Sequence, residues 1–343
     1  MIGRPALRRA VALLGLALVL WAIAAATAAS VFSPQRTGVD IRLQARLDAP
    51  ARFGLQVTRR DCLDDQVPCL LVGPDAGAGP AERGRLLRSQ LAALGVPLRP
   101  YGEVVADVVL LHGRNSRKEH LLPIAERFAA AGFRCIIPDL PGHGDSPLAQ
   151  TRFGATAFER QLPVRVLAEF RRERHLPQLP ALLWGYSMGG AYAVQAAEGD
   201  PPPWRALVVV SSFDRLDAVV DARLAPTLGA LAPAVGWLAT HAPWSAAWQI
   251  PHIRPDRHAA QVRLPALVVH GTEDRLIPPA RGRALLAALG STDKQWVPVP
   301  GAGHQDVFVT DMPLFATMAR WMLRQTDASA AADGQPSAAT PAG

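Results

Sequence analysis

A short apolar run that ends at a serine between glycines constrains this chain more than any other stretch. Residues 182–184 read Leu-Leu-Trp, Gly185 and Ser187 follow, and Gly189 and Gly190 then open an Ala-rich stretch. The G-x-S-x-G spacing predicts a cramped strand-to-helix turn that lifts the Ser187 hydroxyl above the end of the strand and points a helix N-terminus at it. An ordinary glycine-bounded turn has the same spacing, so the partners of Ser187 must decide between the two interpretations.

From about residue 104 onward, apolar strands alternate with amphipathic helices. At 343 residues the chain can bury a large core, and one α/β domain with appendages fits this length. Strands that are apolar throughout and alternate with helices predict a mostly parallel sheet that is covered by helices on both faces. We expect strands at 104–111, 133–138, 181–185, 207–210, 266–270 and 295–299, and helices at 119–131, 158–175, 280–289 and 313–324.

The remaining segments surround this core. Residues 31–100 are expected to supply N-terminal strands and a helix that lead into the fold, and residues 101–325 its core. Between about 214 and 250 the rhythm breaks into a Pro-, Ala- and Trp-rich stretch that is too long for a simple connection, which we interpret as a small helical lid. Residues 326–343 are mostly Ala, Ser, Pro and Gly and are expected to be disordered.

Residues 1–30 have the pattern of an export segment. Arg4, Arg8 and Arg9 precede an uncharged apolar stretch over 11–29, and Ala-Thr-Ala at 26–28 fits a signal-peptide cleavage site. The same stretch is long enough to cross a bilayer as a transmembrane helix. A cleaved signal peptide and a retained membrane anchor therefore both remain open, and both predict an exported protein of the cell envelope or periplasm.

The charge pattern limits the classes of binding partner, and the cysteines bear on the redox compartment. The net charge of +7 comes from scattered arginines, because Lys118 and Lys294 are the only lysines. No basic run interleaves with aromatic residues, so a membrane surface fits better than nucleic acid. Cys62 and Cys69 flank a polar turn and are expected to form a disulfide in an oxidising compartment. No spacing suggests a metal site, and no cofactor is implied.

Two loops late in the chain supply partners for the serine. A serine becomes an effective nucleophile when a base takes its proton and a third group orients that base. Asp274 follows the expected strand at 266–270, and His304 follows the one at 295–299. Because parallel strands open their carboxyl ends on one side of a sheet, Ser187, Asp274 and His304 are expected to meet there. The alternatives are a helix N-cap for the aspartate and a solvated loop histidine.

These motifs resemble the α/β-hydrolase superfamily over residues 104–325, especially its esterases, monoacylglycerol-lipase-like enzymes and serine-aminopeptidase-like proteins. The resemblance implies the α/β-hydrolase fold and a catalytic triad of Ser187, His304 and Asp274. It also implies an oxyanion hole built from the backbone N–H groups of Met188 and Arg114. The motifs that carry it are LHG at 111–113, PDLPGHGDS at 138–146, GYSMGG at 185–190, HGTED at 270–274 and GH at 303–304.

Several polar residues compete for roles in this site. Relatives of this kind more often have a small or aromatic residue in place of Arg114, whose side chain could shape the site, meet an anionic substrate group or be solvated. Asp214 follows the preceding strand and is a rival to Asp274 for the acid. We expect His143 to stabilise its Gly-rich turn and His112 to brace the oxyanion loop.

The expected function is a serine hydrolase that cleaves small-molecule carboxylic esters through an acyl-enzyme. Apolar residues of the predicted lid should line the pocket and favour apolar acyl groups. An acyltransferase, a peptidase or a thioesterase could use the same three residues, and a non-catalytic envelope protein could keep the fold. The sequence does not indicate an oligomeric state.

Overall fold

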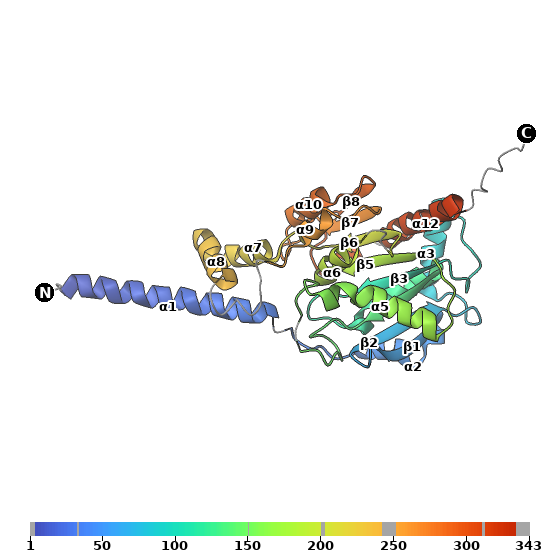
Figure 1. The fold of residues 1–343 in the computed structure, drawn as a ribbon, viewed down its shortest axis with the longest axis horizontal. Helices are drawn as coiled ribbons and strands as arrows, with labels where there is room; N and C mark the ends of the chain where they lie inside the picture. The colour runs from blue at the N-terminus through green and yellow to red at the C-terminus, as the bar shows by residue number, and fades with distance from the viewer. Residues whose placement is uncertain are drawn as a thin grey trace, which may run out of the picture.

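A single eight-stranded sheet forms the centre of the protein (Figure 1). The computed structural model describes residues 4–32, 34–149, 151–199, 203–241, 252–310 and 313–333. The strand order is β1-β2-β4-β3-β5-β6-β7-β8. The six strands β3 to β8 run parallel, and β1 and β2 add an antiparallel edge beside β4. The strands are β1 (Leu55–Cys62), β2 (Val67–Pro74), β3 (Ala106–Leu111), β4 (Phe133–Pro138), β5 (Ala181–Tyr186), β6 (Ala206–Val210), β7 (Ala266–Gly271) and β8 (Lys294–Val299).

Helices cover both faces of the sheet, so the predicted α/β architecture is confirmed. One apolar core lies between the sheet and α3 (Glu82–Ala93), α4 (Leu122–Ala130) and α12 (Leu314–Asp333). A second core lies on the other face, under α5 (Ala157–Glu173), α6 (Met188–Ala196), α9 (Pro255–Ala259) and α10 (Pro279–Ala288). The shorter elements are α2 (Ile41–Asp48), α11 (Val307–Thr310) and the 3-10 turns η1 (Pro50–Phe53), η2 (Lys118–Leu121) and η3 (Gly229–Leu231).

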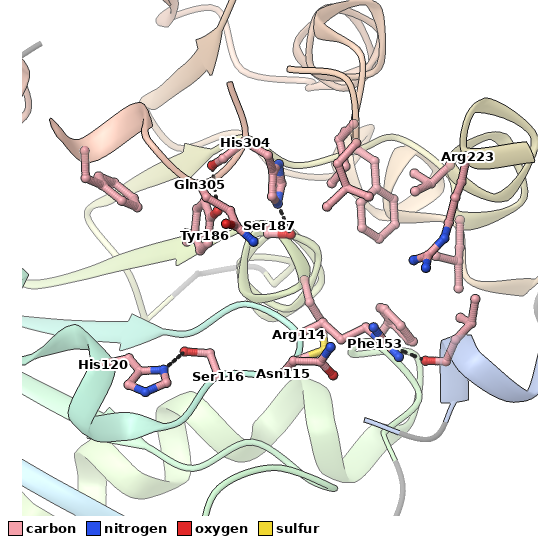
Figure 2. Close-up of a pocket in the computed structure, with 18 of the residues that line it drawn as sticks. Arg114, Asn115, Ser116, His120, Phe153, Tyr186, Ser187, Arg223, His304 and Gln305 are labelled. Carbon is pink, nitrogen blue, oxygen red and sulfur yellow. Dashed lines mark hydrogen bonds between the residues drawn. The ribbon is translucent and has the colours of Figure 1, made fainter. Parts of the chain in front are cut away.

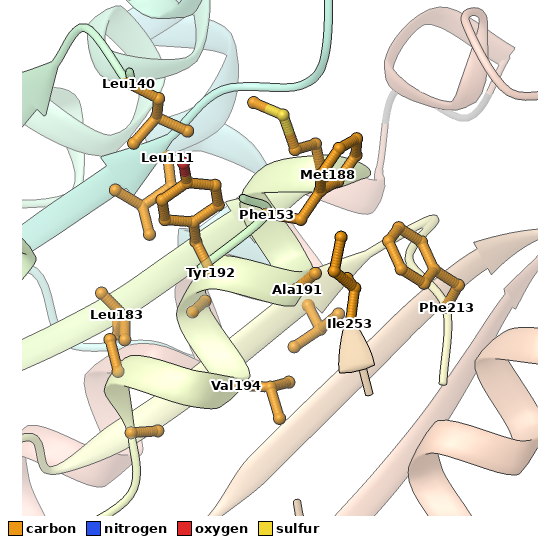
Figure 3. Packing of buried hydrophobic residues seen from close by; sticks show 14 of the residues in the cluster. Leu111, Leu140, Phe153, Leu183, Met188, Ala191, Tyr192, Val194, Phe213 and Ile253 are labelled. Atoms are coloured by element: carbon orange, nitrogen blue, oxygen red, sulfur yellow. The ribbon is translucent and has the colours of Figure 1, made fainter. Parts of the chain in front are cut away.

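The helix that follows Ser187 is buried on every side. All nine residues of α6 are buried, which explains its run of Gly and Ala and its apolar character all round. Its larger side chains, among them Met188 and Tyr192, point into the cluster that also holds Leu111 and Phe213 (Figure 3). This packing makes the N-terminus of α6 a rigid platform for the turn before it.

The edge hairpin of β1 and β2 carries Cys62 and Cys69 without the disulfide that was expected between them. All three cysteines are free and buried. In the hairpin register Cys62 lies opposite Val67, and Cys69 lies opposite Arg60, so the two cysteines are diagonal neighbours. The two thiols interact with each other, but no disulfide joins them in the structure. Burial raises the pKa of the Cys69 thiol well above its usual value.

Two helices at the ends of the domain differ from the expectations. Within residues 31–100 the structure adds α2 to the predicted strands and helix. This helix begins after Asp40, whose carboxylate accepts hydrogen bonds from the Arg42 and Leu43 N–H groups. The tail was expected to be disordered from residue 326, but α12 continues through Asp333. Residues 334–343 lie outside the described residues.

The predicted lid contains two helices beside a long N-terminal helix. α8 (Ala232–His241) lies next to α1 (Arg4–Phe32), which projects away from the sheet, and α7 (Leu216–Leu228) packs against α8 (Figure 1). Residues 242–251, with the lid tryptophans Trp244 and Trp248, lie outside the described residues. By length and composition, residues 8–31 and 216–241 are both apolar enough to cross a membrane.

Candidate active site

Ser187 lies on a strained turn between β5 and α6. Its backbone has φ 54° and ψ −117°, outside the conformations that residues other than glycine prefer. A Cβ atom on Gly185 would lie 2.2 Å from the Gly189 carbonyl oxygen, and one on Gly189 would lie 2.1 Å from the Leu111 carbonyl oxygen. The glycines of the motif are therefore required because backbone segments approach one another closely at this turn.

The structure brings the three predicted residues into one hydrogen-bonded chain. The His304 Nε2 atom lies 3.0 Å from Ser187 Oγ (Figure 2), and His304 Nδ1 lies 2.7 Å from Asp274 Oδ2. Asp274 follows β7 and His304 follows β8, so each reaches Ser187 from the carboxyl end of its own strand. With Nδ1–H donating to the carboxylate, Nε2 is left to accept the serine proton.

The environment of Asp274 keeps its carboxylate ionised. Oδ1 accepts hydrogen bonds from the Leu276 and Ile277 N–H groups at 3.0 and 2.8 Å, and His270 Nε2 lies 3.4 Å from Oδ2. Burial pushes the pKa of Asp274 upward, but the hydrogen bonds from His270, His304 and the Ile277 N–H outweigh it and hold the pKa at about 2. The carboxylate is therefore available to orient His304 at any ordinary pH.

The rival aspartate has a different partner. The Asp214 carboxylate lies 3.2 Å from the Arg281 guanidinium of α10. Burial raises the pKa of Asp214, and Arg281 opposes that change. This geometry gives Asp214 a structural ion pair, whereas Asp274 contacts His304.

A buried histidine shapes the loop that faces the serine. His112 Nδ1 lies 2.8 Å from the Gly113 carbonyl oxygen, and the Leu140 N–H donates to His112 Nε2 at 3.0 Å. These two contacts require the neutral tautomer that carries its proton on Nδ1. Burial lowers the pKa of His112 to about 4, which keeps this tautomer neutral near pH 7. His112 thus braces the loop, as the sequence analysis expected.

The segments that carry the two predicted oxyanion donors lie beside Ser187. Met188 is the first residue of α6 and follows the serine directly. On the other side, a Cβ atom on Gly113 would lie 3.4 Å from the Ser187 Cβ atom, so the loop that leads into Arg114 runs alongside the serine. The helix N-terminus and this loop can together present backbone N–H groups to an oxygen beside Ser187.

The Arg114 side chain binds the end of α1. Its Nε–H donates to the Val31 carbonyl at 3.1 Å, and its Nη2 donates to the Ser30 carbonyl. A cation is favourable at this position because the last carbonyls of a helix carry partial negative charge. Of the three possibilities left open by the sequence, the structure supports the one in which Arg114 shapes the site.

Ser187 and His304 open into a cavity of about 530 Å³ (Figure 2). That volume lies within the range of small-molecule sites. Lid residues of α7 line it, as expected, together with Val31 of α1. The apolar lining consists of Val31, Leu121, Ile124, Phe153, Met188, Phe213, Leu216, Val219, Val220, Leu276, Ile277 and Phe308. Polar groups at the cavity are those of Arg114, Asn115, Ser116, His120, Tyr186, Arg223 and Gln305.

Tyr186 is a site residue that the sequence analysis missed. Its hydroxyl donates to the His304 carbonyl at 2.7 Å, and its ring lies 5.2 Å from the His304 ring. Phe308 of α11 packs against the same tyrosine at 5.1 Å. Tyr186 occupies the variable position of G-x-S-x-G, so the motif carries no signal for its role in positioning the histidine loop.

One acidic cluster outside the cavity has the spacing of a metal site. Oxygen atoms of Glu119, Asp139 and Asp145 lie within 4.8 Å of one another. The Lys118 Nζ atom lies 3.1, 2.7 and 2.6 Å from these three carboxylates, and Arg117 pairs with two of them. The ammonium group already supplies the positive charge that the cluster requires, so we interpret it as an ion-pair network.

Comparisons with known proteins agree with this architecture. The family model "Serine aminopeptidase, S33" matches residues 102–253 and 252–308. The chain is 30% identical over 234 residues to a monoacylglycerol lipase of Mycolicibacterium smegmatis, an alignment that covers 58% of this chain and 80% of that protein. It is 31% identical over 130 residues to a pimeloyl-[acyl-carrier protein] methyl ester esterase of Neisseria meningitidis, covering 37% of this chain and 46% of the other.

A solved structure shows the same fold at low sequence identity. An esterase of Pyrococcus furiosus superposes with a TM-score of 0.57 and 15% identity, and the match covers 85% of this chain and 98% of that one. The family match spans more than half of the chain and includes the turn at Ser187. The protein is therefore a hydrolase of the α/β-hydrolase superfamily, and it belongs to the serine aminopeptidase S33 family.

Proposed function

We propose that the protein is a serine esterase that hydrolyses carboxylic esters with apolar acyl groups. The observation that carries this proposal is the hydrogen-bonded chain from Ser187 through His304 to Asp274, with the serine held at a positive φ before a helix N-terminus. A serine, a neutral imidazole and a buried carboxylate in this order are the parts that nucleophilic acyl transfer requires.

In the first half of the reaction, Ser187 Oγ attacks the ester carbonyl carbon and its proton passes to His304 Nε2. The Asp274 carboxylate holds the imidazole by Nδ1–H and stabilises the imidazolium that forms. The carbonyl oxygen becomes negative in the tetrahedral intermediate, and the N–H groups of Met188 and Arg114 donate hydrogen bonds to it. When the intermediate collapses, the C–O bond to the alcohol breaks and the imidazolium returns its proton to the leaving alcohol.

In the second half, water replaces the alcohol. His304 takes a proton from the water as its oxygen attacks the acyl-enzyme, and the same donors bind the second oxyanion. The bond from the acyl carbon to Ser187 Oγ then breaks, Oγ recovers its proton from His304, and the carboxylic acid leaves. The chain regenerates its starting state without any other reactant.

The apolar wall of the cavity supports the acyl preference. Leu216, Val219 and Val220 of α7 face the same space as Ser187. Each acyl methylene buried there contributes about 0.8 kcal/mol, or roughly a factor of four in kcat/KM. Accommodating three methylenes would favour a medium chain over acetate by tens of fold.

The test is a panel of p-nitrophenyl esters from acetate to dodecanoate, measured on the wild type and on Ser187→Ala. We expect kcat/KM to peak at a medium chain and Ser187→Ala to lose about 10⁴-fold or more in kcat. Ser116→Ala, which changes another serine of the same cavity, is the matched control and should stay within a few fold. A Ser187→Ala enzyme that keeps a tenth of the turnover excludes this nucleophile, and a steady fall from acetate onward excludes the apolar acyl pocket.

A further inference from the structure

The helix α1 has one half outside the domain and one half built into it (Figure 1). Between Val11 and Val19 its large apolar side chains are 52–67% exposed. From Leu20 onward, buried or half-buried side chains recur every three or four residues and form a stripe that packs along α8. This stripe consists of Leu20, Ile23, Ala24, Thr27, Ala28 and Val31.

The inner end of α1 is part of the cavity wall. Val31 lines the cavity, and Arg114, which follows the oxyanion loop, binds the carbonyl groups of Ser30 and Val31. The helix therefore connects directly to the loop that faces Ser187. A segment discarded after export has no need of such a connection.

Cleavage at the predicted signal-peptidase site would damage this packing. A cut after Ala28 removes Ala24 and Ala28, both of which are buried in the core cluster on this face of the sheet. It would also remove most of the part of α1 that packs along α8, whose Val235 and Ala239 are buried in the same cluster. Uncovering buried apolar surface is unfavourable in water, so the packing favours an α1 that stays on the protein.

Both α1 and the lid expose large apolar side chains to solvent. On the lid, Trp237 is 59% exposed and Leu231 is 48% exposed, and neither lines the cavity. The most apolar 18-residue stretch within residues 8–31 has a mean hydropathy of 2.4, which is typical of a helix that enters the hydrocarbon core of a bilayer. Tryptophan is the side chain most typical of the boundary between lipid and water.

We propose that α1 remains on the mature protein as a membrane anchor and that α8 lies in the bilayer interface beside it. The cavity at Ser187 then takes its ester substrate from the membrane, because Val31 of the anchor forms part of the cavity wall. The substrate is a membrane-dissolved lipid ester. This inference deepens the proposed esterase function and rests on it for the identity of the reaction.

A lipid bilayer fits this surface better than a second copy of the chain. The exposed part of α1 is apolar all round from Val11 to Val19, whereas a helix that pairs with one partner needs only a stripe. Arg8 and Arg9 precede this part, at the position where charged side chains flank a bilayer-spanning helix.

The first test measures the anchor and the depth of the lid, and it does not depend on activity. The intact mass of full-length protein recovered from membranes should include residues 11–28; a mature chain that begins at Ala29 overturns the proposal. Because the native cysteines are buried, Trp237→Cys can be labelled with a fluorophore in phosphatidylethanolamine–phosphatidylglycerol vesicles. Glu82→Cys, at an exposed position at the start of α3, is the control.

Spin-labelled lipids in the vesicles should quench the fluorophore at position 237 several-fold more than the one at position 82. Equal quenching at the two positions overturns the placement of α8. Crosslinking of two Trp237→Cys copies through this position, without quenching by lipid, would assign the surface to a second copy and would also overturn the proposal.

The second test separates membrane access from catalysis. The double variant Leu231→Asp/Trp237→Asp should hydrolyse monooleoylglycerol in these vesicles at least tenfold more slowly, with soluble p-nitrophenyl butyrate hydrolysed within twofold of wild type. Equal losses on both substrates, or no loss on either, contradict the proposal. If wild type fails to hydrolyse p-nitrophenyl butyrate, the esterase function fails, while the mass and quenching results still decide the anchor.

Discussion

The two walls of the cavity are built in different ways. The wall with Ser187, His304 and Asp274 is held by short polar contacts and by glycines that allow backbone segments to touch. The wall formed by α1 and α7 is held by apolar packing and by one arginine at a helix end. The triad residues are thus held in fixed positions where bonds would be made and broken. The apolar wall only has to enclose the acyl chain, so its geometry is less tightly constrained. Substitutions of the triad residues should therefore nearly abolish activity, whereas substitutions in the apolar wall should change kcat/KM by degrees.

The largest effect should separate the two candidate acids. Asp274→Asn should lower kcat by about 10³- to 10⁴-fold, because an amide no longer holds His304 in the tautomer that accepts a proton from Ser187. Asp214→Asn removes only an ion pair with Arg281 and should change kcat by a few fold. Steady-state kinetics on one medium-chain ester decides this, and the reverse ranking would move the acid to Asp214.

A second effect concerns the pH dependence of the polar wall. Burial lowers the pKa values of His112 and His143 to about 4 and about 3, from 6.5 in the unfolded chain. Between pH 6.5 and the lowered pKa values, the unfolded chain binds more protons than the folded one. The contribution of these histidines to the free energy of unfolding is therefore complete above pH 6.5 and is lost as the pH falls towards 4. The His112 shift alone corresponds to roughly 3 kcal/mol.

Urea unfolding at pH 7.5 and pH 4.5 measures this loss. His112→Gln, which can still donate to and accept from the same backbone groups, should show a smaller drop in the free energy of unfolding than wild type. If wild type and His112→Gln lose the same amount between the two pH values, His112 is not the sensitive group.

The smallest effect should come from the apolar wall. Val219→Trp puts a larger side chain into the cavity and should lower kcat/KM for dodecanoate about tenfold relative to acetate. Val309→Trp places the same indole on an exposed position of α11 outside the cavity and should leave the ratio unchanged. Equal losses on both esters with Val219→Trp would mean that the lid does not contact the acyl chain.

The polar wall could be predicted from sequence because its information is local. Ser187, Asp274 and His304 each follow a strand of the parallel sheet, and parallel strands bring their carboxyl ends together whatever the loops contain. Hydrophobic patterning located the strands before Ser187 and Asp274 because both strands are buried and continuous in sequence. The convergence of the three residues therefore needed no knowledge of distant contacts.

The features missed from sequence depend on tertiary contacts or register. Arg114 binds a carbonyl that lies 83 positions away in the chain, and no local pattern encodes that contact. Tyr186 sits at a motif position that tolerates many residues, and its role follows from where the His304 loop arrives. The disulfide expected between Cys62 and Cys69 rested on their short separation in sequence. The hairpin register, which that separation does not encode, makes the two residues diagonal neighbours.

The most direct test of the account is covalent labelling of the nucleophile. Full-length protein treated with an alkyl fluorophosphonate should lose ester hydrolysis and gain one adduct, located by peptide mass spectrometry on Ser187. Asp274→Asn should react far more slowly, because the serine then lacks an oriented base. An adduct on another residue, or an active enzyme that never reacts with the probe, would contradict the assignment of Ser187, His304 and Asp274.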